Sequence, residues 1–143
     1  MDLACGQVVV VMQEPKTSPQ LDEKVRGALS KGGVIDITTV GRKSGEPRRI
    51  EIVFHNIDGR IYISGQPYPR RRSWLANLDT HPEFTVHLKG LVRADLTAKA
   101  RIIEDESERR RVLAPIAKAW KRNDLDRMVR ESPLIEVTLD RAA

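Results

Sequence analysis

The pair Asp58-Gly59 stands between two runs of alternating apolar residues, and this feature most constrains the fold. An Asp-Gly pair favours a two-residue hairpin turn, because both residues tolerate positive φ angles. The flanking segments Arg49–His55 and Arg60–Ser64 are therefore predicted to be two paired antiparallel strands. Strands this close together in sequence argue against a sheet in which a helix follows every strand.

Alternating apolar residues predict four more strands along the chain. These strands are Val34–Val40, Phe84–Leu88, Leu96–Ile102 and Leu134–Leu139. Six strands, mostly in hairpin succession, favour a small antiparallel barrel of mainly β (α+β) class with flanking helices. A length of 143 residues fits one domain. We predict that this domain spans residues 21–143 and follows a flexible lead-in of residues 1–20.

Helices are predicted from amphipathic spacing and from residues that begin or end helices. The predicted helical segments are Leu21–Ser30, Ser73–Asp79, Asp105–Arg122 and a further turn or two in Asp124–Arg130. The pair Gly32-Gly33 ends the first helix, and Ser73 is a candidate N-cap of the second. Pro115 is expected to kink or divide the third.

Composition narrows the functional class. A single cysteine, Cys5, cannot form an internal disulfide, which fits a reducing compartment. No apolar run is long enough to span a membrane. Leu-Ala-Cys near the start has no basic region or apolar core before it, so we reject a secretory signal and expect a cytoplasmic protein whose native start is nearer Met12 than Met1.

Several common catalytic motifs are missing from the sequence. Neither a P-loop nor a serine nucleophile elbow occurs. The three histidines, His55, His81 and His87, do not have zinc-ligand spacing, and we interpret them as surface residues. We therefore predict no metal site and no nucleophilic residue.

Positive charge gathers in two short segments of a chain whose net charge is +5. The first is TTVGRKSGEPRR, Thr38–Arg49, which combines two glycines, a serine and four cationic residues. The second is Arg70–Arg72. Guanidinium groups match phosphate and carboxylate oxygens, and glycine turns let backbone NH groups converge on an anion. From the residues alone, each cluster is either a solvated loop or an anion site.

Three stretches resemble the deazaflavin-dependent nitroreductase family, a branch of the split β-barrel flavin and deazaflavin oxidoreductases. They are TTVGRKSGEPRR, DGRIYISG and SWLANLDTHPEFTVHL, and their order and rough spacing are those of the family. The resemblance covers about Leu21 to Leu139. It implies a split antiparallel barrel that binds coenzyme F-420, a deazaflavin with a phosphodiester and an oligoglutamate tail.

The resemblance also implies which residues bind the cofactor. They are Arg42, Lys43 and Ser44 in the turn; Arg48, Arg49, Ile50 and Val53 on the next strand; Ser64, Gly65 and Gln66 after the third strand; and Trp74, Asn77 and Leu78 on the short helix. The redox chemistry would belong to the cofactor, with the protein positioning it against the substrate. Ser64, Gln66 or a water molecule is our hypothesis for the proton source.

The implied function is a reductase that transfers a hydride from reduced F-420 to a flat, electron-poor organic substrate. Quinones, enones or activated double bonds are favoured over nitro compounds, because the segment VLAPIAKAWKRNDLDRMV lacks the tyrosines that the family places over nitro substrates. Its one aromatic residue, Trp120, either packs in the core or covers the substrate.

Two other interpretations stay open at this point. One keeps the barrel but binds FMN in place of F-420. The other is a binding module without turnover, either a cofactor carrier or a nucleic-acid-binding barrel; the six aromatic residues are mostly not interleaved with the basic runs, so we expect no nucleic acid. The expected partners are a small-molecule cofactor and a hydrophobic organic substrate, bound by a monomer or a homodimer.

Overall fold

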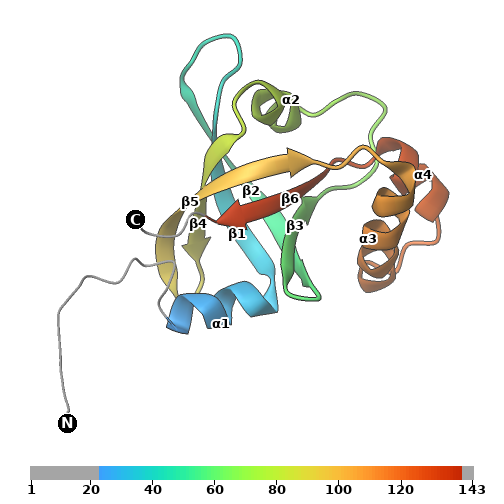
Figure 1. Cartoon of the computed structure of the whole chain (residues 1–143), viewed down its shortest axis with the longest axis horizontal. Helices are drawn as coiled ribbons and strands as arrows, with labels where there is room; N and C mark the ends of the chain where they lie inside the picture. The colour runs from blue at the N-terminus through green and yellow to red at the C-terminus, as the bar shows by residue number, and fades with distance from the viewer. Residues whose placement is uncertain (1–22, 140–143) are drawn as a thin grey trace, which may run out of the picture.

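The computed structural model describes residues 23–139, which form a closed six-stranded antiparallel barrel flanked by helices (Figure 1). The strands are β1 (Gly33–Val40), β2 (Pro47–Ile57), β3 (Arg60–Ser64), β4 (Glu83–Lys89), β5 (Arg93–Ile102) and β6 (Leu134–Leu139). The helices are α1 (Glu23–Lys31), α2 (Ser73–Thr80), α3 (Glu106–Ala119) and α4 (Leu125–Glu131). The predicted fold class is confirmed, whereas the lead-in at residues 1–20 lies outside the described residues.

The barrel closes in the order β1-β2-β3-β6-β5-β4, and every pair of neighbouring strands is antiparallel. The predicted hairpin turn is present between β2 and β3, where Asp58 and Gly59 have φ angles of 54° and 82°. Asn56 supports the turn, because its side-chain oxygen accepts a hydrogen bond from the Gly59 NH at 3.1 Å. This tight turn fixes the register in which Phe54 lies opposite Ile63.

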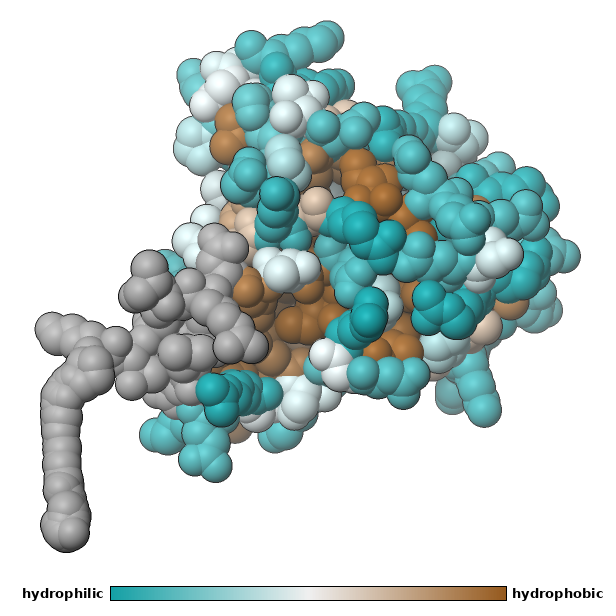
Figure 2. All heavy atoms as spheres, in the orientation of Figure 1, coloured by the Kyte–Doolittle hydropathy of each residue, from teal (hydrophilic) through white to brown (hydrophobic). Residues whose placement is uncertain are grey.

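Two hydrophobic cores lie on opposite sides of the β3–β6 part of the barrel wall. Ile63 and Ile135 belong to the cluster that fills the barrel, whereas Tyr62 and Leu134 pack with residues of α3 and α4. Because successive side chains of a strand point to opposite faces, the same two strands serve both cores. Hydrophilic residues cover the end of the molecule where α3 and α4 lie (Figure 2).

Two predicted details are wrong, the cap at Ser73 and the helix end at Arg122. Ser73 is the first residue of α2 and not its cap; Arg72 holds the cap position, without a side-chain capping bond. Pro115 lies inside α3 and does not divide it, since Pro115 is exposed and the buried Val112 and Ile116 hold the helix against the second core. The predicted end at Arg122 is also wrong, because α3 ends at Ala119.

The histidines differ in their surroundings. His81 is exposed, as predicted. The surface interpretation is wrong for His87, which is 8% exposed because Thr38 and Asp95 on the neighbouring strands contact both ring nitrogens at 2.7 Å. It is also wrong in part for His55, which is half-buried with its ring 5.3 Å from that of Trp120.

No helix within residues 23–139 is long and apolar enough to cross a membrane. The same part of the chain contains no group of three or more histidine, cysteine or acidic side chains that could hold a metal ion.

Candidate functional site

The turn between β1 and β2 is folded tightly by its own hydrogen bonds. The Gly41 NH donates to the carbonyl of Glu46, and the Gly45 NH donates to the carbonyl of Gly41, both at 2.8 Å. A Cβ at Gly41 would lie 2.6 Å from the Ser44 hydroxyl and 3.2 Å from the Glu46 carbonyl, so a larger residue there would displace the Ser44 side chain. The Ser44 hydroxyl also accepts hydrogen bonds from the Glu46 NH and the Arg48 guanidinium. These contacts within the turn fix its backbone conformation.

A buried amide attaches this turn to α2. The Asn77 side-chain oxygen accepts hydrogen bonds from the Arg42 backbone NH at 3.1 Å and from its guanidinium at 3.3 Å. The Asn77 amide nitrogen donates to the Thr39 hydroxyl at 3.1 Å, and the residue is only 5% exposed. Asn77 therefore positions the cationic turn against the helix that carries Trp74.

A cavity of about 810 Å³, here called the turn cavity, lies between this turn, β2 and α2. It brings together seven of the residues predicted to bind the cofactor: Arg42, Lys43, Ser44, Arg48, Ile50, Trp74 and Asn77. The opposite wall is the loop Tyr68–Arg72, which contains the second basic cluster. Two clusters separated in sequence therefore face one cavity, and the aromatic Trp74 lines it between them.

A second cavity of about 500 Å³, here called the β3-end cavity, is lined by four more predicted residues: Val53, Ser64, Gly65 and Gln66. Trp120 and Arg122 complete its lining together with Ile52, so Trp120 is not only a core residue. The Ser64 hydroxyl donates its hydrogen to the carbonyl of Pro133 at 2.7 Å. Ser64 can therefore accept a hydrogen bond in this cavity, but its proton is already used.

Arg72 joins the two cavities. It lines the turn cavity, and its guanidinium donates at 2.8 Å to the carbonyl of Gln66, which lines the β3-end cavity. On β2, Ile50 lines the first cavity and Ile52, two residues on, lines the second, so the cavities follow one another along the strand. The Arg72 Nε atom is buried and has no hydrogen-bond partner. Buried polar atoms are normally paired, so this donor is suited to an anionic ligand.

Two predicted residues are not at these cavities. Arg49 points to the other face of β2 and binds Asp36 at 2.9 Å; hydrogen bonds from Lys89 and Arg49 lower the pKa of that carboxyl. Leu78 is 2% exposed and packs in the barrel core. The alternation of side chains along a strand explains the first placement, and the apolar side of α2 explains the second.

Some lining residues were not predicted. Arg122 was assigned to a helix, and nothing in its sequence context indicates that it reaches the β3-end cavity. Tyr68 was assigned only to a loop; its ring lies 5.5 Å from the Arg72 guanidinium and thus shapes the turn cavity. Pro67 and Pro69, on either side of Tyr68, restrict the conformation of this loop. They are the feature of the sequence that could have indicated an ordered loop at the cavity.

The electrostatic character of the turn cavity is cationic. Lys43 has no partner within the part of the chain that the structure describes, and Arg48 is 4.0 Å from Glu46, the limit of an ion pair. Across the cavity, Arg72 donates only to a neutral carbonyl. Phosphate groups bind well where several such cations converge.

Comparison with known proteins identifies the family. A family model described as F420H(2)-dependent quinone reductase matches residues 13–138, so the chain belongs to this family. The resemblance to the deazaflavin-dependent oxidoreductases is thereby confirmed. The protein is an oxidoreductase whose family depends on F-420.

Solved structures show the same fold at low sequence identity. A conserved hypothetical protein from Mycobacterium tuberculosis is 17% identical, with 89% of this chain and 87% of that chain covered and a TM-score of 0.68. General Stress Protein 26 from Bacillus anthracis is 18% identical, with 85% and 90% covered and a TM-score of 0.61. A FAD-binding protein from Mesorhizobium loti is 12% identical, with 85% and 91% covered and a TM-score of 0.54.

Proposed function

We propose that this protein transfers a hydride from reduced F-420 to a quinone or a similarly electron-poor organic molecule. The observation that carries the proposal is the convergence of both basic clusters on the turn cavity, next to a more apolar cavity along the same strand. A phosphate-bearing cofactor with a flat ring needs both environments side by side. The family match supports F-420 as that cofactor.

The residues present fit the chemistry of the cofactor. The phosphodiester would bind in the turn cavity to Arg42, Lys43 and Arg48, and the unpartnered Arg72 Nε could donate to it from the opposite wall. The deazaflavin ring would lie in the β3-end cavity against the apolar side chains of β2, which leaves Trp120 to contact the substrate. When bound, F-420 supplies the hydride-donating carbon.

The protein would contribute position, exclusion of water and a path for one proton. Near-contact geometry between two flat molecules supplies much of the rate, and the apolar wall favours it by excluding water. Ser64 would accept a hydrogen bond from the ring and hold it, because its own hydrogen is bound to Pro133. A water molecule hydrogen-bonded to Gln66, which is exposed, would then deliver the proton to the product.

A quinone is the substrate that the observations support best. The description of the family names a quinone reductase. The segment over the β3-end cavity presents Trp120 and Arg122, and no tyrosine occurs in α3 or α4. The electron-rich Trp120 ring suits stacking on an electron-poor quinone.

Binding of FMN is the second candidate, because one structural neighbour with the same fold is described as FAD-binding. Fold likeness at 12% identity does not transfer a ligand, so it ranks below F-420. Parallel fluorescence titrations with F-420 and with FMN separate the two: selective F-420 binding is expected, and binding of FMN alone would overturn the proposal.

The double variant Arg42→Ala/Lys43→Ala tests the assignment of the turn cavity. We expect F-420 affinity to fall about tenfold or more, since two cations near the phosphodiester are lost. Stability should be nearly unchanged, because exposed cations contribute little to it. Affinity equal to that of the wild type would place the phosphodiester elsewhere. A matched control is Arg26→Ala/Arg93→Ala on α1 and β5, which removes the same charge at residues that line neither cavity.

A further inference from the structure

The segment between α3 and α4 brings two large side chains, Trp120 and Arg122, to the β3-end cavity. Helix α3 ends in a Schellman motif: the Lys121 NH donates to the carbonyl of Lys118 at 3.1 Å, and the next NH donates to that of Ala117 at 2.9 Å. Lys121 has a φ angle of 56°, a conformation that glycine adopts more readily. The chain turns sharply there, so the residues on both sides of Lys121 reach one cavity.

The residue that follows the left-handed position of a Schellman motif is often apolar and packs on the helix. Here that position holds Arg122, whose side chain is 26% exposed and lines the β3-end cavity. A charge adds nothing to the usual apolar contact at a helix end. The arginine at this position therefore calls for another explanation.

Asp124 holds Arg122 in one orientation. The carboxylate accepts two hydrogen bonds from the guanidinium, from Nε at 2.9 Å and from Nη2 at 2.6 Å. Such bidentate pairs fix the plane of the guanidinium. The third nitrogen, Nη1, donates to no residue between positions 23 and 139. Arg122 is therefore oriented in advance and keeps a donor for a ligand.

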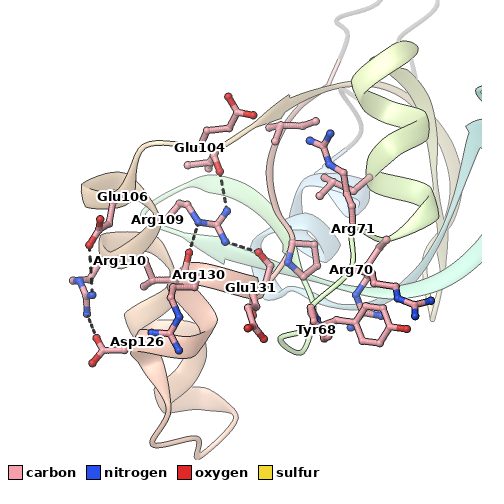
Figure 3. Close-up of a pocket in the computed structure, with 18 residues that line it drawn as sticks. Tyr68, Arg70, Arg71, Glu104, Glu106, Arg109, Arg110, Asp126, Arg130 and Glu131 are labelled. Atoms are coloured by element: carbon pink, nitrogen blue, oxygen red, sulfur yellow. Dashed lines mark hydrogen bonds and ion pairs between the residues drawn. The ribbon is translucent and has the colours of Figure 1, made fainter.

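The helices on both sides of this segment are packed together. They share the second hydrophobic core, against which Trp120 also packs. In addition, Arg110 on α3 binds Asp126 on α4 at 2.8 Å, at the edge of a separate cavity that these helices share with the loop Tyr68–Arg72 (Figure 3). Both ends of the segment therefore rest on packed helices, which keeps Arg122 in place.

The β3-end cavity contains one cation in largely apolar surroundings. Among the described residues that line it, Arg122 alone carries a charge. Ile52, Val53 and Trp120 form the apolar part of the lining. The hydrogen of the Ser64 hydroxyl is already donated to a carbonyl. A cation in such surroundings interacts strongly with a nearby negative charge, because little water screens it.

We propose that Arg122 is a catalytic residue: its guanidinium binds the quinone oxygen on which negative charge develops during hydride transfer. This inference rests on the proposed function. The quinone receives one hydrogen nucleus and two electrons from reduced F-420, so one of its oxygens becomes an anion and the cofactor is oxidised. A donor at that oxygen lowers the barrier, because it interacts more strongly with the transition state than with the neutral quinone.

Arg122 keeps its own proton throughout this step. Hydrogen bonds to Asp124 raise the pKa of the guanidinium. The quinone anion is therefore protonated by the water at Gln66, and the solvent regains one proton from the oxidised cofactor. In total, one hydride and one proton pass to the quinone, which leaves as the neutral hydroquinone.

The first test measures binding and not turnover. It uses protein saturated with oxidised F-420 and two naphthoquinones of similar size. 2-Hydroxy-1,4-naphthoquinone is an anion at neutral pH, with its charge on oxygen atoms as in the proposed product, whereas 2-methoxy-1,4-naphthoquinone is neutral. Isothermal titration calorimetry gives the ratio of the two dissociation constants for each protein variant.

Arg122→Gln should lower the preference for the anion about tenfold or more, as for the loss of one charge-assisted contact. Lys121→Gln is the matched control, because it removes the same charge from an exposed neighbour that does not line the cavity; it should keep the wild-type ratio. Arg122→Gln/Asp124→Asn leaves the net charge unchanged and no carboxylate without its partner. This double variant should lose the preference as well.

The second test measures the rate of a single turnover with 1,4-naphthoquinone. In Arg122→Gln this rate should fall about tenfold to a hundredfold, because a donor at the developing anion is lost. The affinity for F-420 should stay within about twofold of the wild type, since the proposed contact is with the substrate. Lys121→Gln should react at the wild-type rate.

The outcomes separate this inference from the proposed function. If the wild type reduces no quinone with reduced F-420, the proposed function is wrong, and the inference with it. If the wild type reduces quinones but both Arg122 variants keep either the anion preference or the rate, Arg122 does not bind the developing anion. An equal loss in Lys121→Gln would make the effect one of net charge, and a large loss of F-420 affinity in Arg122→Gln would assign Arg122 to the cofactor; either result would overturn the inference.

Discussion

The variant Asn77→Ala tests whether one buried amide holds the cationic turn in place. The substitution removes three hydrogen bonds, two to Arg42 and one to Thr39. A buried hydrogen bond contributes about 1 kcal/mol net, and the bond to the exposed Arg42 guanidinium contributes less. The free energy of unfolding should therefore fall by about 2–3 kcal/mol, including the cost of an unpaired Thr39 hydroxyl.

The same change should weaken F-420 binding, although Asn77 carries no charge. Without the bond to its backbone NH, Arg42 is no longer fixed opposite the loop Tyr68–Arg72. Urea unfolding measures the first effect, and fluorescence titration in the absence of urea measures the second. Thr80→Ala, at the exposed end of the same helix, is the control and should change neither quantity. A loss of stability below about 0.5 kcal/mol together with unchanged affinity would refute the reasoning.

Three further predictions concern residues near the cavities. Trp74→Ala should lower stability by about 3–5 kcal/mol and also weaken F-420 binding, because the 8% exposed indole packs in the core and lines the turn cavity; urea unfolding and titration check both. Leu78→Ala should lower stability by about 2–4 kcal/mol while the folded fraction keeps its affinity, since Leu78 lines neither cofactor cavity. Burial lowers the pKa of His55, so the unfolded chain binds a proton more readily than the folded one. The contribution of His55 to the free energy of unfolding should therefore be complete above about pH 6.5 and decrease as the pH falls below it. His55→Leu should flatten this decrease in urea titrations at several pH values; an unchanged pH profile would assign it to other groups.

The strands and their succession were predictable from the sequence, because alternation and the Asp58-Gly59 turn are local signals. Closure of the barrel was predicted, but the pairs β3–β6 and β1–β4 join segments far apart in the chain. Their register depends on packing and has no local signal. The same limit explains the histidines: His87 is covered by neighbours that only strand pairing brings to it.

The candidate site was also predictable only where its residues carry a local sequence signal. The motif around Lys43 marked the turn, and the structure brings most of the predicted residues to two adjoining cavities. Arg49 was included because the family resemblance places the strand after Arg48 beside the cofactor, but neighbouring side chains on a strand point to opposite faces. The place of Arg122 could not be predicted, because it depends on the positive φ angle of Lys121 and on how α3 and α4 pack.

The division of the hydrophobic interior into two cores has a consequence for how such proteins diversify. Tyr62 and Leu134 face α3 and α4, whereas Ile63 and Ile135 face the barrel, so the helical layer rests on an outer surface that the barrel does not need for its own packing. Substitutions in α3, α4 and the segment between them can therefore reshape the surface over the β3-end cavity without disturbing the turn that carries Arg42 and Lys43. The lining of the β3-end cavity and the cationic turn can therefore change independently of each other in evolution.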